Sequence, residues 1–288
     1  MIFWRTLTKL FWISRPVSWP NTAYPFAAGY LMSGGQVDAV FVVGTLFFLI
    51  PYNLLMYGIN DVFDYESDIL NPRKGGIEGM REQRAFHPTI MTASIVLSIP
   101  FVVFLLSQGT PISKLVLLGS VFFVLAYSIK YLRFKERPVL DSITSSIHFV
   151  SPLVYALTLS GFDTVAWPFV IAFFLWGMAS HAFGAVQDII PDRAGGIASI
   201  ATILGAASTV RLSATFYLVA SLIVIVQGFP ALLVGLTGLT YLMNIARYLA
   251  ISDQASSTTN AAWRRFLMLN YLSGFVLTMV LISIGFSS

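Results

Sequence analysis

Aspartate is concentrated in two short stretches of this sequence, NDVFDYESD, which begins at Asn60, and DIIPD, which begins at Asp188. In the first, Asp61, Asp64 and Asp68 are spaced i, i+3 and i+7, which predicts one helical stripe with Asn60 one turn before Asp64. Such like charges repel one another unless a cation lies among them, although a solvated helix end would tolerate them. Oxygen ligands suit Mg²⁺, commonly completed by phosphate oxygens. The stretch therefore predicts a magnesium site for a phosphorylated substrate.

The second stretch provides another acidic pair, Asp188 and Asp192, at spacing i, i+4. Pro191 forbids a regular helix through this stretch, so spacing alone leaves open whether the two carboxylates share a face. A pattern of Asp, Arg and Gly-Gly-Ile recurs at an offset of 120 residues, from Asp68 and from Asp188. This recurrence is consistent with two related halves that present facing acidic motifs to one cavity. The glycine-rich loops could bind phosphate, or their glycines could serve plain turns.

Both acidic stretches lie at the ends of long apolar segments. Hydrophobic residues make up 57% of the chain and charged residues 10%, and the mean hydropathy is +0.79, which is typical of an integral membrane protein. The apolar windows lack the alternation of a barrel and predict about nine helices within a single transmembrane domain over 1–288. Their expected ranges are 17–34, 38–61, 89–108, 112–130, 139–160, 165–188, 198–226, 229–250 and 263–285.

The basic residues follow the expected membrane topology. They gather in alternate connections, and the opposite connections hold only Lys114, which places the N-terminus and the basic loops in the cytoplasm and the C-terminus outside. This distribution accounts for the net charge of +4 without a nucleic-acid partner. The N-terminus lacks a cleavable signal pattern, so Met1 is expected to stay. The absence of cysteine excludes disulfides, thiolate catalysis and Cys-based metal binding.

The two acidic stretches carry a resemblance to a known family. NDVFDYESD fits the N-D-x-x-D-x-x-x-D motif, and DIIPD the D-x-x-x-D motif, of the UbiA-type intramembrane prenyltransferases. That family has these motifs at the ends of its second and sixth helices, and the resemblance covers essentially the whole chain. It implies an all-α bundle of about nine transmembrane helices around a central cavity open to the cytoplasmic side and to lipid. It also implies Mg²⁺-dependent transfer of a prenyl group from its diphosphate.

Longer stretches resemble the bacterial lycopene elongases of C50 carotenoid synthesis. They are SRPVSWPNTAYPFAAGYL, IPYNLLMYGINDVFDYESDILNPRKGG, LRFKERPVLDSITSSIHFVSP and FFLWGMASHAFGAVQD. The resemblance implies that dimethylallyl diphosphate is the donor and that lycopene, dissolved in membrane lipid, is the acceptor. The implied products are C45 and C50 carotenoids of the nonaflavuxanthin and flavuxanthin type, and the implied location is the bacterial cell membrane.

This chemistry assigns expected roles to the charged residues. The expected metal ligands are Asn60, Asp61, Asp64, Asp68, Asp188 and Asp192, of which the five aspartates are also the expected catalytic residues. The cations expected to bind diphosphate are Arg73, Lys74, Lys130, Arg133 and Arg193, each of which could instead be a topology-setting surface charge. The family has a Tyr-x-x-x-Lys pattern after helix 4. Here Lys130 falls three places after Tyr127, so Lys130 and Arg133 remain alternatives beside that tyrosine.

Departure of diphosphate leaves an allylic cation, which aromatic faces can stabilise and shield from water. The aromatic candidates, each alternatively a packing or interfacial residue, are Tyr52, Tyr57, Phe63, Tyr65, Trp176 and Phe183. His148, Asp141 and His181 are candidate proton acceptors or water positioners, or simply hydrogen-bonding residues inside the bundle. Arg211, within the seventh predicted helix, implies a buried partner.

Two other functions compete with the elongase interpretation. A related enzyme would have a polar acceptor, such as a quinone precursor or a glycerolipid. A transporter or channel would also use intramembrane acids, but these should lie near the bilayer midplane rather than at helix ends on one side. Magnesium-dependent release of diphosphate separates enzyme from transporter, and the identity of the acceptor separates the two enzymes.

Overall fold

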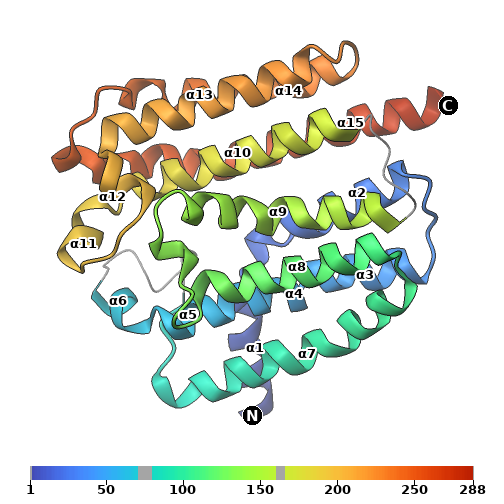
Figure 1. Ribbon diagram of the computed structural model, residues 1–288, viewed down its shortest axis with the longest axis horizontal. Helices are drawn as coiled ribbons and strands as arrows, with labels where there is room; N and C mark the ends of the chain where they lie inside the picture. The colour runs from blue at the N-terminus through green and yellow to red at the C-terminus, as the bar shows by residue number, and fades with distance from the viewer. Residues whose placement is uncertain (1, 71–79, 160–165, 288) are drawn as a thin grey trace. The chain divides into compact units, whose positions relative to one another are not determined.

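The computed structural model describes residues 2–70, 80–159 and 166–287, and most of them belong to helices (Figure 1). In chain order the helices are α1 (Ile2–Ile13), α2 (Pro20–Met32), α3 (Ala39–Leu49), α4 (Pro51–Asn53), α5 (Ile59–Phe63), α6 (Tyr65–Leu70), α7 (His87–Gln108), α8 (Pro111–Ser128), α9 (Leu140–Leu159), α10 (Trp167–Val186), α11 (Ile189–Ala194), α12 (Ile200–Leu204), α13 (Ala206–Ile225), α14 (Ala231–Ile245) and α15 (Asn260–Ser287).

The predicted all-α membrane class is confirmed. Within the described ranges there is no strand, and seven helical stretches are long and apolar enough to cross a bilayer. Every predicted span overlaps helical structure, although the ranges 38–61 and 198–226 are interrupted. In addition, α2 has 13 residues and α14 has 15, fewer than the roughly 20 that a bilayer core requires. Nine spans, and a central cavity, therefore stay predictions.

The chain forms two compact units, and each acidic motif lies in a different one. Unit 1 comprises residues 1–134 and 147–164, and unit 2 comprises residues 135–146 and 165–288. The expectation of one domain over 1–288 remains a prediction.

Unit 1 is built around a long, interrupted span from Ala39 to Phe63. Pro51 has no N–H, so the helix breaks there, and the nearby carbonyl of Phe48 accepts hydrogen bonds from the Thr22 hydroxyl at 2.7 Å and the Asn53 amide at 2.8 Å. A π-helical turn, Leu54–Gly58, follows before α5. The span therefore reaches the acidic motif after two departures from regular α-helix.

Aromatic side chains fill the core of unit 1. Fully buried rings contact one another through edges and faces, and they belong to Phe26, Phe47, Phe48, Tyr52 and Tyr155. This packing holds α2, α3 and α9 together at the level of the Pro51 break. The expected role of Tyr52 near the reacting cation thus has a packing component.

Unit 2 is organised by α10 and α13, which pack against each other, with α14 beside α13 (Figure 1). Its core contains Phe183, Tyr217, Tyr241 and Tyr248, and the Tyr217 hydroxyl lies 3.0 Å from that of Ser180. Buried hydroxyl groups that hydrogen-bond in this way avoid the free energy penalty of an unpaired polar group in an apolar interior.

The seventh predicted helix is divided in two, which corrects the expectation for Arg211. Gly205 adopts φ +76°, a left-handed conformation that suits glycine, and separates α12 from α13. Arg211 consequently lies in the second turn of α13, where it is exposed and donates a hydrogen bond to the Leu249 carbonyl at 2.9 Å. Its partner is a peripheral backbone carbonyl, so no buried ion pair is required.

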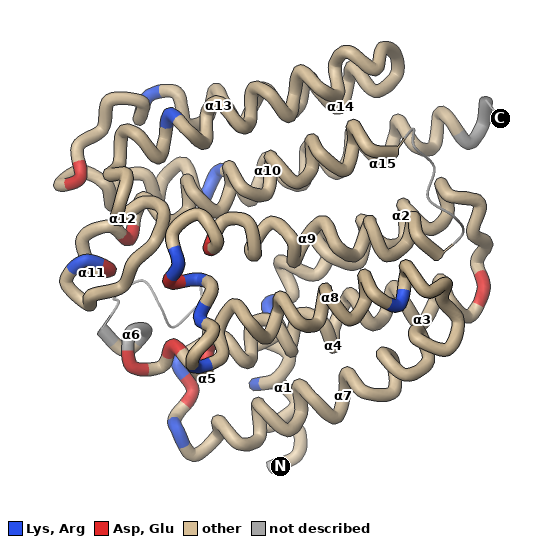
Figure 2. Tube along the Cα trace, in the orientation of Figure 1, with Lys and Arg blue, Asp and Glu red and all other residues tan. Residues whose placement is uncertain are grey.

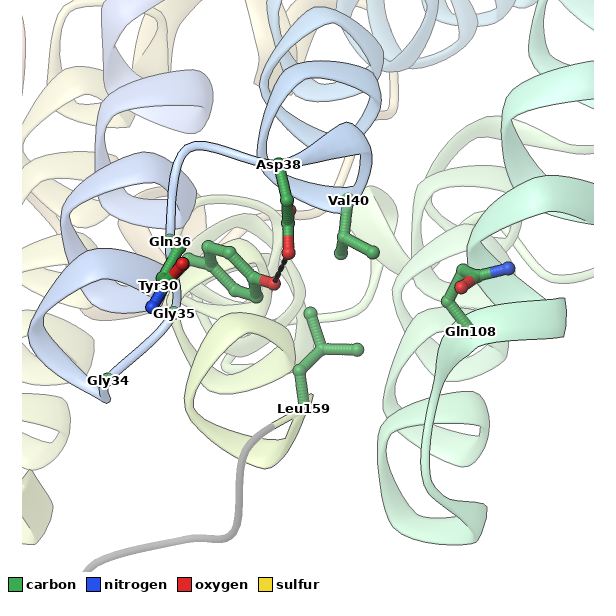
Figure 3. A pocket seen from close by; sticks show the side chains of 8 residues that line it. All are labelled: Tyr30, Gly34, Gly35, Gln36, Asp38, Val40, Gln108 and Leu159. Atoms are coloured by element: carbon green, nitrogen blue, oxygen red, sulfur yellow. Dashed lines mark hydrogen bonds between the residues drawn. The ribbon is translucent and has the colours of Figure 1, made fainter.

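A polar cavity of about 350 Å³ lies in unit 1, and Figure 3 shows the residues that line it. Asp38, one of its lining residues, caps α3 by accepting a hydrogen bond from the Phe41 N–H at 2.9 Å, which lowers the pKa of its carboxyl. Its other oxygen accepts from the Tyr30 hydroxyl at 2.9 Å. Asp38 and the acidic motif mark opposite ends of the same span, so this cavity is separate from the candidate active site.

Candidate active site

The first acidic motif surrounds a turn between α5 and α6. Asp64 ends α5 with φ −97° and ψ 0°, and its N–H donates to the Asn60 carbonyl at 2.9 Å. This bridge region of backbone space is sparsely populated in general and frequent in active sites. Asp61 and Asp64 are buried, and Figure 2 shows acidic and basic positions gathered around α5 and α6.

Asp61 is held by groups from two other segments of unit 1. Its Oδ1 accepts a hydrogen bond from the Arg15 guanidinium at 2.7 Å, and its Oδ2 accepts from the Met80 N–H at 3.2 Å. The side chains of Arg15 and Asp61 are 15% and 3% exposed. The same guanidinium lies 4.2 Å from the ring centroid of Tyr57. Asp61 is thus part of a buried ion pair, and Tyr57 contacts the cation of that pair.

Asn60 and Asp64 have different neighbours, near the end of α8. The Asn60 amide donates to the Ser128 hydroxyl at 3.1 Å, and the Arg133 guanidinium lies 3.7 Å from Asp64. Arg133 also donates a long hydrogen bond of 3.4 Å to the Phe63 carbonyl. Lys130, in contrast, is exposed, with its ammonium 5.4 Å from the ring centroid of Tyr131. Of the two alternative cations, Arg133 is therefore the one placed beside the motif.

The second acidic motif lies in unit 2, between α10 and α11. Asp188 precedes α11 with φ −99° and ψ 0°, and the Asp192 N–H donates to its carbonyl at 2.9 Å. Pro191 is the third residue of α11, where a backbone N–H has no hydrogen-bond partner within the helix. The proline therefore does not interrupt this helix. One helical turn joins Asp188 to Asp192, and both side chains are half-buried, so the backbone at Pro191 is compatible with a shared face, which stays a prediction.

The two motifs correspond in backbone geometry. Asp64 and Asp188 each follow a membrane-spanning helix and have nearly the same φ and ψ, and each is followed four residues later by another aspartate, Asp68 or Asp192. The backbone geometry thus pairs Asp64 with Asp188, at an offset of 124 residues. The recurring Arg and Gly-Gly-Ile residues have an offset of 120. In the sequence, the Arg and Gly-Gly-Ile residues therefore follow Asp64 at a distance four residues longer than the one after Asp188.

Arg193 follows the second motif and contacts groups of unit 2 other than the two aspartates. Its guanidinium donates to Asp253 at 2.6 Å and, through two nitrogens, to the Thr202 carbonyl at 3.1 and 2.7 Å. Asp253 in turn accepts from the Ala206 N–H at 2.7 Å, at the start of α13. These contacts give Arg193 a structural role in joining α11, α12 and α13, beside its expected role with diphosphate.

Some predicted residues lie outside the described part of the chain. They are Arg73 and Lys74, with the first glycine-rich loop. Asp68 lies on α6, but the structure does not describe its side chain. The expected roles of these residues stay predictions.

The predicted aromatic and proton-accepting residues fall into several groups. In unit 1, the Tyr52 hydroxyl donates to the His148 carbonyl at 3.1 Å, and the rings of Tyr127 and His148 are 5.1 Å apart. Tyr65 contacts His87 edge to face, at 4.9 Å. Tyr52, Tyr127 and His148 therefore form one cluster, whereas Tyr65 lies in another place.

In unit 2, the predicted residues have packing or capping contacts. Trp176 stacks on Phe266 at 5.6 Å between centroids, and Phe183 is buried in the same core. Asp141 is buried and accepts a hydrogen bond at 2.8 Å from the Ile200 N–H, the first N–H of α12, beside the N-cap residue Ser199, and it lies within electrostatic range of His181. A positioning or capping role thus explains Asp141, while His181 stays a candidate.

Three residues that support the motifs have no signal in the local sequence: Arg15, Ser128 and Asp253. Arg15 lies 46 residues before its partner Asp61, and Ser128 lies 68 residues after its partner Asn60. Asp253 lies 60 residues after Arg193. No periodicity connects residues at such separations, so only the folded chain reveals these pairs.

The donor chemistry of the motifs fits Mg²⁺, because every candidate ligand is a carboxylate or amide oxygen. Within the described ranges, no group of three or more His, Cys, Asp or Glu side chains is close enough to hold a metal ion alone. Each motif supplies an Asp-xxx-Asp pair, a number of ligands that suits an ion completed by water and by the phosphate oxygens of a substrate.

Comparison with known proteins gives concordant matches. The model of the UbiA prenyltransferase family matches residues 22–273. The chain is 50% identical over 273 residues to a lycopene elongase/hydratase of Corynebacterium glutamicum, covering 94% of this chain and 95% of that protein. It is also 50% identical to the C(50) beta-cyclic carotenoids biosynthesis protein LbtBC of a Dietzia species, covering 96% of this chain but 65% of that longer protein.

A solved structure shares the fold. A UbiA homolog from Archaeoglobus fulgidus, bound to DMAPP and Mg²⁺, superposes with a TM-score of 0.66 at 17% identity, covering 92% of this chain and 98% of the other. At that identity, the likeness shows the fold alone.

Proposed function

This chain belongs to the UbiA prenyltransferase family, and from that premise we propose that it is a lycopene elongase, which adds dimethylallyl units from dimethylallyl diphosphate to the ends of lycopene. The products are C45 and then C50 carotenoids of the nonaflavuxanthin and flavuxanthin type. The observation that carries the proposal is the matched pair of Asp-xxx-Asp turns at helix ends. They occur in a chain half identical to a lycopene elongase/hydratase over most of both sequences.

The reaction breaks the bond between the allylic carbon and the diphosphate oxygen and forms a carbon–carbon bond to the terminal double bond of lycopene. Diphosphate leaves with the bonding electron pair. The tertiary cation on the acceptor then loses a proton or captures water, and water capture agrees with the word hydratase in the name of the Corynebacterium protein.

The metal ligands that we assign are Asn60, Asp64 and Asp68 in the first motif and Asp188 and Asp192 in the second. Mg²⁺ bound there would supply Lewis-acid chemistry that neutralises the diphosphate and makes it a better leaving group. Asp61 is set apart from this group because protein donors occupy both of its carboxylate oxygens.

Arg133 is the cation best placed to take the remaining phosphate charge, because it lies 3.7 Å from Asp64 and is partly exposed. Lys130 and Arg193 are weaker candidates, since one points over an exposed tyrosine ring and the other joins three helices of unit 2. Arg73 and Lys74 keep their expected role on sequence grounds.

The cluster of Tyr52, Tyr127 and His148 is our candidate for stabilising the allylic cation and positioning the acceptor end. Its aromatic rings offer electron-rich faces, and His148 is 2% exposed, so water has little access to it. The acceptor is a hydrocarbon without hydrogen-bonding groups, so apolar shape must position it. A site built for a polar acceptor would contain polar side chains that hydrogen-bond to it, and these side chains would be left unpaired if lycopene bound instead.

The protein is a multi-pass membrane protein, and we propose that its N-terminus and both acidic motifs face the cytoplasm in a bacterial cell membrane. The transporter alternative is disfavoured because Asp64 and Asp188 lie at the ends of spans, away from the expected midplane.

Expression of the chain in a lycopene-producing bacterium, followed by mass analysis of the pigments, tests donor, acceptor and product together. Lycopene should gain one and then two C5 units, with oxygen added where water is captured. Purified enzyme with dimethylallyl diphosphate should also leave 4-hydroxybenzoate and 1,4-dihydroxy-2-naphthoate unchanged. Comparable turnover of either aromatic acid, without a mass gain on lycopene, would overturn the elongase assignment in favour of a polar acceptor.

A further inference from the structure

A buried ion pair ties the N-terminal segment to the first acidic motif. Arg15 lies between α1 and a short 3₁₀ turn, Pro16–Ser18, and adopts φ +51°, a left-handed conformation that a non-glycine residue rarely takes. In this conformation its guanidinium bonds Asp61 and lies over the face of Tyr57. An unfavourable backbone conformation persists only where the surroundings compensate for it, and these two contacts of the guanidinium contribute to that compensation.

Asp61 joins three segments of unit 1 through its two oxygens. Arg15 brings the chain after α1, Asp61 belongs to α5, and Met80 begins the described chain that leads to α7. Lys9 of α1 makes a second ion pair, with Glu82, two residues beyond Met80. The carboxylate of Asp61 therefore serves as a junction.

The geometry of α5 separates Asp61 from the other polar residues of the motif. At 100° per residue, Asn60 and Asp64 are about 40° apart around the helix, whereas Asp61 is about 60° from Asp64 and about 100° from Asn60. The observed contacts agree, since Asn60 and Asp64 approach Ser128 and Arg133, and Asp61 approaches Arg15. The stripe predicted from the i, i+3, i+7 spacing is thus divided into two flanks.

We propose that Arg15 is a positioning residue that acts through Asp61, and that Asp61 anchors the motif instead of ligating the metal ion. The pair neutralises one of the three aspartates and fixes the rotation of α5, so that Asn60 and Asp64 present their oxygens on the flank near Arg133. This inference rests on the proposed function, and it reduces the ligands of the first motif to an amide and the Asp-xxx-Asp pair that the second motif also has.

The experiment compares purified full-length variants in lipid nanodiscs with two readouts. One is Mn²⁺ binding, by electron paramagnetic resonance, in the presence of the unreactive thiolodiphosphate analogue of dimethylallyl diphosphate. The other is kcat and KM for the donor with lycopene as acceptor. The variants are Asp61→Asn, Asp64→Asn, Arg15→Gln and the double variant Arg15→Gln/Asp61→Asn. Arg84→Gln, which breaks an exposed ion pair with Glu66, is the matched control.

Asp61→Asn should bind Mn²⁺ within about 3-fold of the wild type, because the asparagine oxygen still accepts from Arg15 and no metal ligand is lost, although the amide nitrogen cannot accept from the Met80 N–H. Asp64→Asn should lower the affinity for Mn²⁺ by more than roughly 10–100-fold, the loss typical of changing a residue that only supports a metal ligand. Equal losses of Mn²⁺ binding in these two variants would overturn the proposal.

Arg15→Gln leaves Asp61 as a buried carboxylate without its cation, and should lower kcat by roughly 10–100-fold at nearly unchanged donor KM. Adding Asp61→Asn removes that charge and should recover part of the lost kcat, since the two residues act as one pair. A double variant no more active than Arg15→Gln would overturn the proposal, as would a kcat for Arg15→Gln equal to that of the Arg84→Gln control. Mn²⁺ binding can be measured even if lycopene is not the acceptor. Failure of this proposal can therefore be distinguished from failure of the proposed function.

Discussion

In the first acidic motif the backbone turns at Asp64 with φ −97° and ψ 0°, and in the second it turns at Asp188 with φ −99° and ψ 0°. The surroundings differ more than the turns. Asp61 and Asp64 are buried, with Arg15 and Arg133 close by, whereas Asp188 and Asp192 are half-buried and the neighbouring Arg193 contacts Asp253. The units thus share the backbone geometry that presents two acids, while the supporting cations are particular to each.

The strongest test of this correspondence removes one acid from each turn. Asp64→Ala and Asp188→Ala should each lower elongation of lycopene by more than about 100-fold, because a lost metal ligand exceeds the effect of an outer-shell change. Product mass after a fixed time, with saturating donor and Mg²⁺, is the measurement.

Asp38→Ala, at the opposite end of unit 1, is the control and should keep most of the activity. Retention of near wild-type turnover by either acidic-motif variant would break the equivalence of the two turns.

The correspondence also requires both motifs to face one side of the membrane. Single cysteines replacing Tyr131, beside the first motif, and Ala194, beside the second, should react with an impermeant maleimide only from the cytoplasm. A cysteine replacing Gln36, in the connection before α3, should react only from outside, because three spans separate it from Tyr131. The chain has no other cysteine. Labelling of the Tyr131 and Ala194 positions from opposite sides would contradict the comparison.

A finer test concerns the cation beside the first motif. Arg133→Ala should lower kcat/KM for the donor by roughly 10–100-fold, because it removes a charge 3.7 Å from Asp64. Lys130→Ala should change it by less than about 3-fold, since exposed charges interact weakly through solvent. Steady-state kinetics with varied donor measures both. The reverse order of effects would identify Lys130 as the cation of this site.

The smallest expected effect belongs to the support of the second motif. Asp253→Asn weakens the ion pair with Arg193 and the cap of α13, and should lower the free energy of unfolding by about 1 kcal/mol. Turnover at 25 °C should fall less than about 3-fold, because Asp253 belongs to neither acidic pair. Thermal unfolding in nanodiscs measures the first quantity. A loss of turnover as large as that of Asp188→Ala would assign Asp253 to the chemistry.

Much of the fold, and the two acidic motifs that we propose as the site, could be predicted from local sequence patterns. Hydropathy locates the spans because burial in lipid demands about 20 apolar residues in a helix, and the acid spacing locates both motifs. The interruptions at Pro51 and Gly205 depend on one residue each and were not predicted within the longer apolar windows. The break at Gly205 is also the reason that Arg211 is peripheral.

The neighbours of each acid could not be predicted in the same way. Three aspartates at i, i+3 and i+7 lie along one side of a helix, but they act together only when they share partners. Here Arg15, 46 residues away in the sequence, binds Asp61. Arg133 could be separated from Lys130 only because the chain turns after α8 with left-handed conformations at Tyr131 and Arg133. Such contacts depend on tertiary structure, which spacing along one helix does not encode.

The π-helical turn at Leu54–Gly58 has a consequence for the orientation of the acids that follow it. A π-turn accommodates one residue more than an α-turn, so every later side chain on the span is rotated by about 100° relative to an uninterrupted helix. Asp61 meets Arg15 and Asp64 meets Arg133 only in this angular register. The length of an apolar turn that contains no charged residue therefore decides which neighbours the acidic side chains meet.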